Sequence, residues 1–117
     1  MVVGSIAFLT ACSTPKENEM EWFDHAVKTS GQQLLYMAEQ LKNEPDTACF
    51  PRSIKDGKFR LEHPTDWTSG FYPGSMWLAY ELTDDEALAK EARKYTNRLQ
   101  DMQYYTGCLL YTSDAAD

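Results

Sequence analysis

The fold is decided by the stretch Asp66-Trp67-Thr68-Ser69-Gly70-Phe71-Tyr72-Pro73-Gly74-Ser75-Met76-Trp77, which places four aromatic residues, two glycines and a proline within a short span. Aromatic side chains carry a large apolar area and bury it where they can. Pro73 has a fixed φ and suits the first turn of a helix. The stretch therefore predicts a loop up to Tyr72 and a helix from about Pro73 to Leu82, with these side chains facing inward: Met76, Trp77 and Tyr80.

This aromatic stretch has two interpretations from composition alone. A ring held at the mouth of a helix by a glycine-containing turn can serve as a platform for a sugar or another flat apolar face. The same rings can instead form a plug in the core, which is the usual fate of large aromatic side chains. Both interpretations stay open at the level of the residues.

The remaining periodicity predicts an all-α protein. Apolar residues recur at helical spacing over residues 19–42 and again from Leu88 to Met102. Thr83 and Glu86 fit a capping box at the start of a third helix, which should end near Gln103. The segment between these helices, residues 43–65, contains several prolines and is expected to be a long connection with a turn at Asp56-Gly57.

Composition limits the class of partner. The chain has 117 residues, a net charge of −7 and a pI near 4.7, which fits one small acidic domain. Phosphate binding needs basic patches, so a nucleic-acid partner is not expected. A local basic pocket for a sugar acid remains compatible with this charge. The cysteines, Cys12, Cys49 and Cys108, form neither a disulfide framework nor a zinc pattern.

The N-terminal residues have the pattern of a lipoprotein signal. A short apolar run leads into Leu9-Thr10-Ala11-Cys12, which predicts a signal peptide and lipobox over residues 1–12 with Cys12 as the lipidated residue. A polar tether over residues 13–18 would follow. The expected location is the bacterial cell envelope, in the periplasm or at the outer membrane, with membrane contact only through the lipid anchor. The alternative is a short buried strand with a structural cysteine.

Residues 66–83 resemble the first signature of the unsaturated glucuronyl hydrolases, glycoside hydrolase family 88. The resemblance extends back to Phe50-Pro51-Arg52-Ser53 and forward to Gln103-Tyr104-Tyr105-Thr106-Gly107. It implies that residues 19–107 are the first helices of an (α/α)6 six-hairpin barrel. It also implies that Trp67 helps to bind substrate. Arg52 can be read as facing an acidic sugar or as a structural residue.

The resemblance further implies a reaction. Family enzymes release a 4,5-unsaturated uronic acid from lyase-generated oligosaccharides by hydrating the sugar's double bond, with no metal and no organic cofactor. The expected ligands are unsaturated oligosaccharides from the breakdown of glycosaminoglycans or related polysaccharides. The family's catalytic aspartates would follow Gly107, where the tail of residues 108–117 aligns with nothing in the family. No catalytic residue is therefore assigned, and neither Asp114 nor Asp117 is a candidate.

Three functions follow from these observations. The first is a truncated unsaturated glucuronyl hydrolase, an N-terminal fragment that is itself inactive although its full-length parent is an enzyme. The alternative is a non-catalytic glycan-binding surface lipoprotein, for which Trp67 and Cys12 would serve equally well. The third is a small helical structural lipoprotein. An aspartate soon after Thr106-Gly107 in a complete gene would favour the enzyme.

Overall fold

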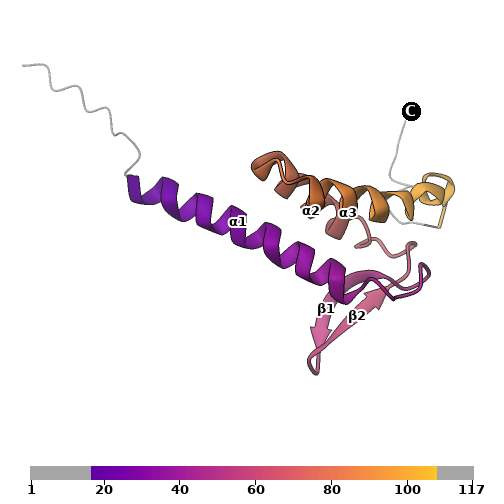
Figure 1. Cartoon of the computed structure of the whole chain (residues 1–117). Coiled ribbons are helices and arrows are strands. Elements are labelled where there is room, and N and C mark those ends of the chain that lie inside the picture. Colours follow the sequence, from indigo (N-terminus) through magenta and orange to yellow (C-terminus); the bar gives the residue numbers. More distant parts are fainter. Residues whose placement is uncertain (1–16, 108–117) are drawn as a thin grey trace, which may run out of the picture.

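The computed structural model describes residues 17–107, which form three helices, a hairpin and a short 3-10 helix (Figure 1). The order is α1 Glu17–Gln40, β1 Phe50–Lys55, β2 Lys58–Glu62, α2 Phe71–Thr83, α3 Glu86–Asn97 and η1 Gln100–Tyr104. The lipobox with Cys12 and the tail of residues 108–117 lie outside the described residues. Helix α1 starts inside the expected tether of residues 13–18.

Helix α1 follows the periodicity predicted for it, with a boundary that differs by about one half-turn at each end. Its C-terminal half is anchored, because the Ala38 side chain is buried and Leu41, just beyond the helix, is 2% exposed. Its N-terminal half carries Trp22 and Phe23, which are exposed. The helix therefore has one end in the core and one end with an open apolar surface.

The predicted all-α class is wrong for residues 50–62, which form an antiparallel hairpin of β1 and β2. Asp56 and Gly57 both have positive φ, 52° and 74°, in a two-residue turn between Lys55 and Lys58. Positive φ at both central positions is typical of the turn that matches the twist of a hairpin. A two-stranded ribbon has only edge strands, so Pro51 can stay in β1 without losing a ladder bond.

Helix α2 begins at Phe71, earlier than the sequence predicted, and includes Tyr72, which was expected in a loop. Pro73 lies in the first turn, where its missing N–H has no helical acceptor to lose. The helix ends where Asp84 adopts a left-handed conformation, φ 55°, and its N–H donates to the Tyr80 carbonyl at 2.8 Å. This C-terminal geometry separates α2 from α3 by two residues.

The predicted capping box at Thr83 and Glu86 is also wrong. The N-cap of α3 is Asp85, whose carboxylate accepts from the Ala87 amide at 2.9 Å. The Thr83 hydroxyl instead donates to the Ala79 carbonyl of α2 at 2.7 Å. At its other end α3 stops at Asn97, and η1 continues the chain in a tighter helical form, rather than one helix reaching Gln103.

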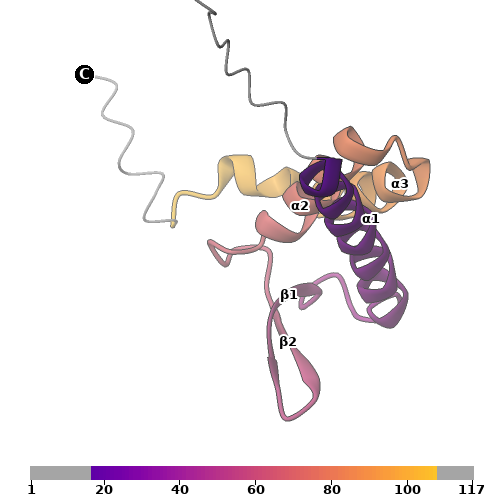
Figure 2. The same cartoon turned by 90° about the vertical axis from the view of Figure 1, so that its left-hand side faces the viewer.

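The core lies where the three helices and the start of the hairpin meet, as the two views show (Figures 1 and 2). The ring of Tyr95, on α3, is the centre of this core, with ring centroids 5.8 Å from Phe50 and 4.9 Å from Tyr72 in edge-to-face geometry. Phe50 thereby ties the hairpin to the helices. The fully or nearly buried cluster consists of Ala38, Cys49, Phe50, Tyr72, Met76, Ala92 and Tyr95.

A hydrogen bond and an ion pair connect the elements around this core. The Tyr72 hydroxyl donates to the Leu34 carbonyl of α1 at 3.1 Å, across 38 positions of sequence. The Arg98 guanidinium, after α3, lies 2.7 Å from a carboxylate oxygen of Asp46 in the connection that precedes the hairpin. Among residues 17–107, none of the helices is long and apolar enough to cross a membrane.

Candidate functional site

Trp67 lies in a loop of successive turns between β2 and α2. Backbone hydrogen bonds of 2.9–3.0 Å close these turns, from the amides of Asp66, Ser69 and Phe71 to the carbonyls of His63, Asp66 and Thr68. The Ser69 side chain is buried and donates to the Pro64 carbonyl at 2.9 Å. The turns of the loop are therefore closed by hydrogen bonds within the loop itself.

Asp66 fixes the backbone on both sides of Trp67. One oxygen of its carboxylate, Oδ1, accepts from the Thr68 amide at 2.9 Å and from the Thr68 hydroxyl. This is the local hydrogen bonding that makes aspartate favourable in turns. Trp67 lies between the two residues that this bond joins, so its backbone position is well defined.

Trp67 and Phe71 form an exposed aromatic pair at the start of α2. Their ring centroids are 5.7 Å apart and their planes meet at 87°. Trp67 is 61% exposed and Phe71 63% exposed. We call these two exposed side chains, which meet edge to face, the aromatic corner. Paired rings held on a defined backbone offer a large apolar contact area at a small cost in conformational entropy.

A charged cluster lies beside the aromatic corner. The Arg52 Nη1 atom, from β1, is 3.4 Å from Asp66 Oδ2 and 3.5 Å from Glu62 Oε1. Arg60, from β2, contacts the same Glu62 carboxylate at 3.1 Å through its Nε atom. Glu62 and Asp66 are each 20% exposed at their side chains, whereas Arg60 is 62% exposed. The hairpin thus brings two cations and one anion to the loop that carries Trp67, and the loop itself supplies the second anion, Asp66.

The surroundings of Asp66 favour its ionised form. The pKa of this carboxyl is held below its ordinary value, mainly by the hydrogen bond from the Thr68 hydroxyl, then by the Thr68 amide and, after these, by Arg52 and Arg60. Hydrogen bonds to a carboxylate stabilise its charged form. An acid of this kind is deprotonated at neutral pH and is unsuited to donate a proton. Asp66 is therefore a structural anion.

The buried titratable side chains belong to the core. Burial raises the pKa of the Cys49 thiol and that of the Tyr95 hydroxyl, and it raises the pKa of Tyr72 far above the ordinary tyrosine range. Each of these groups is neutral at physiological pH. A buried thiol with a raised pKa is a poor nucleophile. We assign them to packing.

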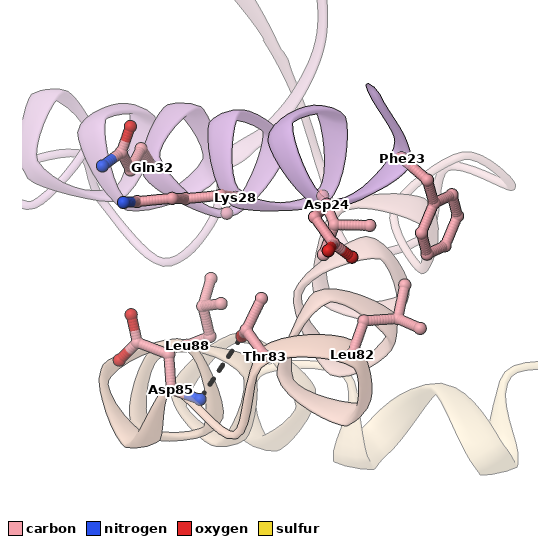
Figure 3. A pocket seen from close by; sticks show the side chains of 10 residues that line it. Phe23, Asp24, Lys28, Gln32, Leu82, Thr83, Asp85 and Leu88 are labelled. Carbon is pink, nitrogen blue, oxygen red and sulfur yellow. Dashed lines mark hydrogen bonds between the residues drawn. The ribbon is translucent and has the colours of Figure 1, made fainter. Parts of the chain in front are cut away.

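A separate hollow lies where α1 faces the junction of α2 and α3, about 430 Å³ in volume (Figure 3). Phe23, Asp24 and Lys28 of α1 line one side, and Leu82 and Leu88 lie across from them. It does not include the aromatic corner. Its walls are mainly helix faces, and its polar groups do not converge on one point, so we place the candidate site at the aromatic corner.

Within residues 17–107, His, Cys, Asp and Glu side chains do not gather in any group of three able to hold a metal ion. The structure places Trp67 at the surface, beside Phe71 and directly after Asp66 of the charged cluster. Arg52 is occupied by two carboxylates. Phe71 was not among the site residues predicted from the sequence. The signal for it was weak, because the predicted helix began only at Pro73, whereas α2 begins at Phe71 and leaves this ring 63% exposed beside the buried Tyr72. Cys12, Asp114 and Asp117 lie outside the described residues.

Comparisons with known proteins bear on this site. No family model matches the chain. An unsaturated glucuronyl hydrolase of Formosa agariphila is 45% identical over 108 residues, covering 88% of this chain and 26% of the relative. A second unsaturated glucuronyl hydrolase, of Bacillus sp. (strain GL1), is 34% identical over 94 residues, covering 73% of this chain and 24% of the relative.

A solved structure agrees with these sequence matches. The crystal structure of an unsaturated glucuronyl hydrolase specific for heparin superposes with a TM-score of 0.60 at 36% identity, over 73% of this chain and 22% of that one. The chain is therefore homologous to a class of carbohydrate-acting hydrolases. Over most of its length, its relatives within that class are the unsaturated glucuronyl hydrolases. It spans about a quarter of the length of these relatives.

Proposed function

We propose that this chain contributes the aromatic corner to a site for unsaturated uronides and that the activity it serves is hydrolysis of these sugars. The observation that carries the proposal is the exposed Trp67–Phe71 pair, held by Asp66 in a region homologous to unsaturated glucuronyl hydrolases. The substrates would be oligosaccharides that end in a 4,5-unsaturated uronic acid. An (α/α)6 barrel is the proposed setting of the three helices described here.

The role of Trp67 in this reaction is to position the sugar. A ring face that excludes water holds the pyranose in place. The bound sugar then loses less entropy when an acid approaches its double bond. In the proposed reaction, an acid protonates C4, water adds at C5, and the resulting hemiketal opens so that the glycosidic bond is lost. We assign no described residue to that acid, because the Asp66 carboxylate is held ionised.

The direct test is a titration of the chain with an unsaturated uronyl disaccharide, followed by tryptophan fluorescence. We expect saturable binding that Trp67→Ala abolishes and Phe71→Ala weakens. Trp22→Phe is the matched control, because Trp22 is also an exposed tryptophan, 71% exposed, on α1. The ultraviolet absorbance of the double bond should persist, since binding alone gives no acceleration. Equal binding by the parent chain and Trp67→Ala would contradict the proposal.

The alternative function, a non-catalytic glycan-binding surface lipoprotein, uses the same aromatic corner. It also depends on lipidation of Cys12 and a location in the bacterial cell envelope, which we retain as a proposal based on the Leu9-Thr10-Ala11-Cys12 pattern. Mass spectrometry of the protein isolated from its host tests this. Acyl chains on an N-terminal Cys12 are expected, and an unmodified Cys12 with residues 1–11 retained would exclude the anchor.

A further inference from the structure

Arg52 occupies a β-bulge in β1. The register pairs Pro51 with Leu61 and Ser53 with Arg60, so Arg52 is an extra residue that has no partner on β2. A bulge bends its strand and redirects the side chain of the extra residue. The direction of the Arg52 side chain is therefore set by the backbone of the hairpin, before any ion pair is considered.

That direction brings one nitrogen atom to two carboxylates. Arg52 Nη1 lies 3.5 Å from Glu62, at the end of β2, and 3.4 Å from Asp66, in the loop of the aromatic corner. The two oxygens of the Asp66 carboxylate have different partners. Oδ2 faces Arg52, and Oδ1 holds the amide of Thr68 at 2.9 Å. A continuous set of polar contacts thus runs from the bulge to the residues on both sides of Trp67.

We propose that Arg52 is a positioning residue, which fixes the orientation of Trp67 through the Asp66 carboxylate without touching the sugar itself. The bulge points Arg52 at Asp66, Asp66 holds the turn, and the turn sets the direction of the indole ring. This inference rests on the proposed function only for the use made of Trp67. The coupling between Arg52 and Trp67 is a property of the chain without ligand.

The Arg52–Asp66 ion pair contributes little energy, which explains why it affects the orientation of Trp67 more than the stability of the fold. The Arg52 side chain is 38% exposed and that of Asp66 is 20% exposed, so solvent screens their attraction. Ion pairs of this kind add little to global stability. A loop whose turns are already closed by backbone hydrogen bonds needs only a weak additional restraint to select one orientation. A selected orientation lowers the cost of ordering that a ligand would otherwise meet.

The experiment uses the full chain with 5-fluorotryptophan at its three tryptophans and records fluorine NMR spectra without ligand. The Trp67 resonance is assigned by its loss in Trp67→Phe. We expect Arg52→Gln to shift or broaden this resonance while the resonances of Trp22 and Trp77 stay unchanged. Arg52→Lys should restore part of the parent spectrum, because an ammonium group keeps the charge but not the planar fork.

Arg60→Gln is the matched control. Arg60 shares Glu62 with Arg52 but forms no ion pair with Asp66, so its loss should leave the Trp67 resonance in place. An unchanged Trp67 resonance in Arg52→Gln would overturn the proposal. So would equal shifts in Arg52→Gln and Arg60→Gln, which would indicate a general charge effect. A collapse of all three resonances would show that Arg52 serves stability instead.

A titration with an unsaturated uronyl disaccharide separates this inference from the proposed function. With both correct, Arg52→Gln should weaken binding by no more than about fivefold, the fold-change that corresponds to an exposed ion pair. A chain that binds no disaccharide, but whose Trp67 resonance responds to Arg52→Gln, would refute the function and keep the coupling. Unaltered spectra with intact binding would refute the coupling and keep the function.

Discussion

Two aromatic pairs of this protein share a geometry and differ in burial. Trp67 and Phe71 meet edge to face at 5.7 Å and 87°, and Tyr72 and Tyr95 meet edge to face at 4.9 Å and 83°. The first pair is more than 60% exposed at each residue, whereas Tyr72 is 6% exposed and Tyr95 fully buried. Phe71 and Tyr72 are neighbours in sequence, so one peptide bond separates the aromatic corner from the core.

This contrast shows that residue type alone does not decide what an aromatic cluster does. The sequence allowed either a platform or a core plug, and the start of α2 contributes one ring to an exposed pair and one ring to a buried pair. The step of about 100° between successive helical residues sends Phe71 outward and Tyr72 inward. The position of a ring in the helical register, more than its chemistry, therefore decides whether Phe71 or Tyr72 is buried.

The largest expected effect comes from truncating a ring in each region. Phe50→Ala should lower the free energy of unfolding by about 3–5 kcal/mol, because it leaves a cavity beside Tyr95. Phe71→Ala should change the free energy by about 0.5 kcal/mol or less, since its ring is mostly in water. Urea unfolding followed by circular dichroism measures both. Similar losses in the two variants would show that the aromatic corner is part of the core.

A smaller effect distinguishes the two buried tyrosines. Tyr72→Phe removes the hydrogen bond to the Leu34 carbonyl and should cost about 1 kcal/mol. Tyr95→Phe is the matched control. Among the described residues the Tyr95 hydroxyl is buried without a hydrogen-bond partner, so its removal should be neutral or stabilising. The same urea titration reports both values, and a larger loss for Tyr95→Phe would reverse this assignment of the two hydroxyls.

The smallest effect concerns pH at the aromatic corner. The folded-state pKa of Asp66 lies below its ordinary value, so the ionised carboxylate stabilises the folded loop above the ordinary pKa of about 3.9. This stabilisation is lost as the pH falls through the lower folded-state pKa. Thr68, Arg52 and Arg60 are the groups that stabilise the anion. The fluorine resonance of Trp67 should hold from neutrality to about pH 5 and move only below about pH 4.

Asp66→Asn is the control for that titration, because the amide keeps an oxygen for the Thr68 amide and cannot ionise. Its Trp67 resonance should be independent of pH over this range. A transition near neutral pH in the parent chain would contradict the assignment of this pH dependence to Asp66.

The sequence predicted the helices well because their apolar spacing is decided locally. It located α1, α2 and most of α3, and it identified the turn at Asp56-Gly57. It did not predict the hairpin on either side of that turn, because a two-stranded ribbon with Pro51 in it has weak local strand signals and depends on Phe50 reaching the core. The misplaced cap at Thr83 has a similar cause, since its hydroxyl had a competing acceptor in α2.

The candidate site was predicted in part. Trp67 was named from a resemblance, and the structure places it in a loop that Asp66 holds by a hydrogen bond to the Thr68 amide. The pairing of Trp67 with Phe71 depends on where α2 begins, which sequence reasoning placed at Pro73. The contact between Arg52 and Asp66 depends on a bulge, and no feature of the sequence marks which residue of β1 is the extra one.

The hairpin has a practical consequence for anyone who works with this protein. Its turn at Asp56-Gly57 lies at the far end of β1 and β2, which extend away from the three helices (Figures 1 and 2). Exposed turns of this kind accept inserted sequence more readily than packed elements do. An affinity peptide or a dye-labelling tag placed between Asp56 and Gly57 would therefore project into solvent, beyond the strands that connect it to the core.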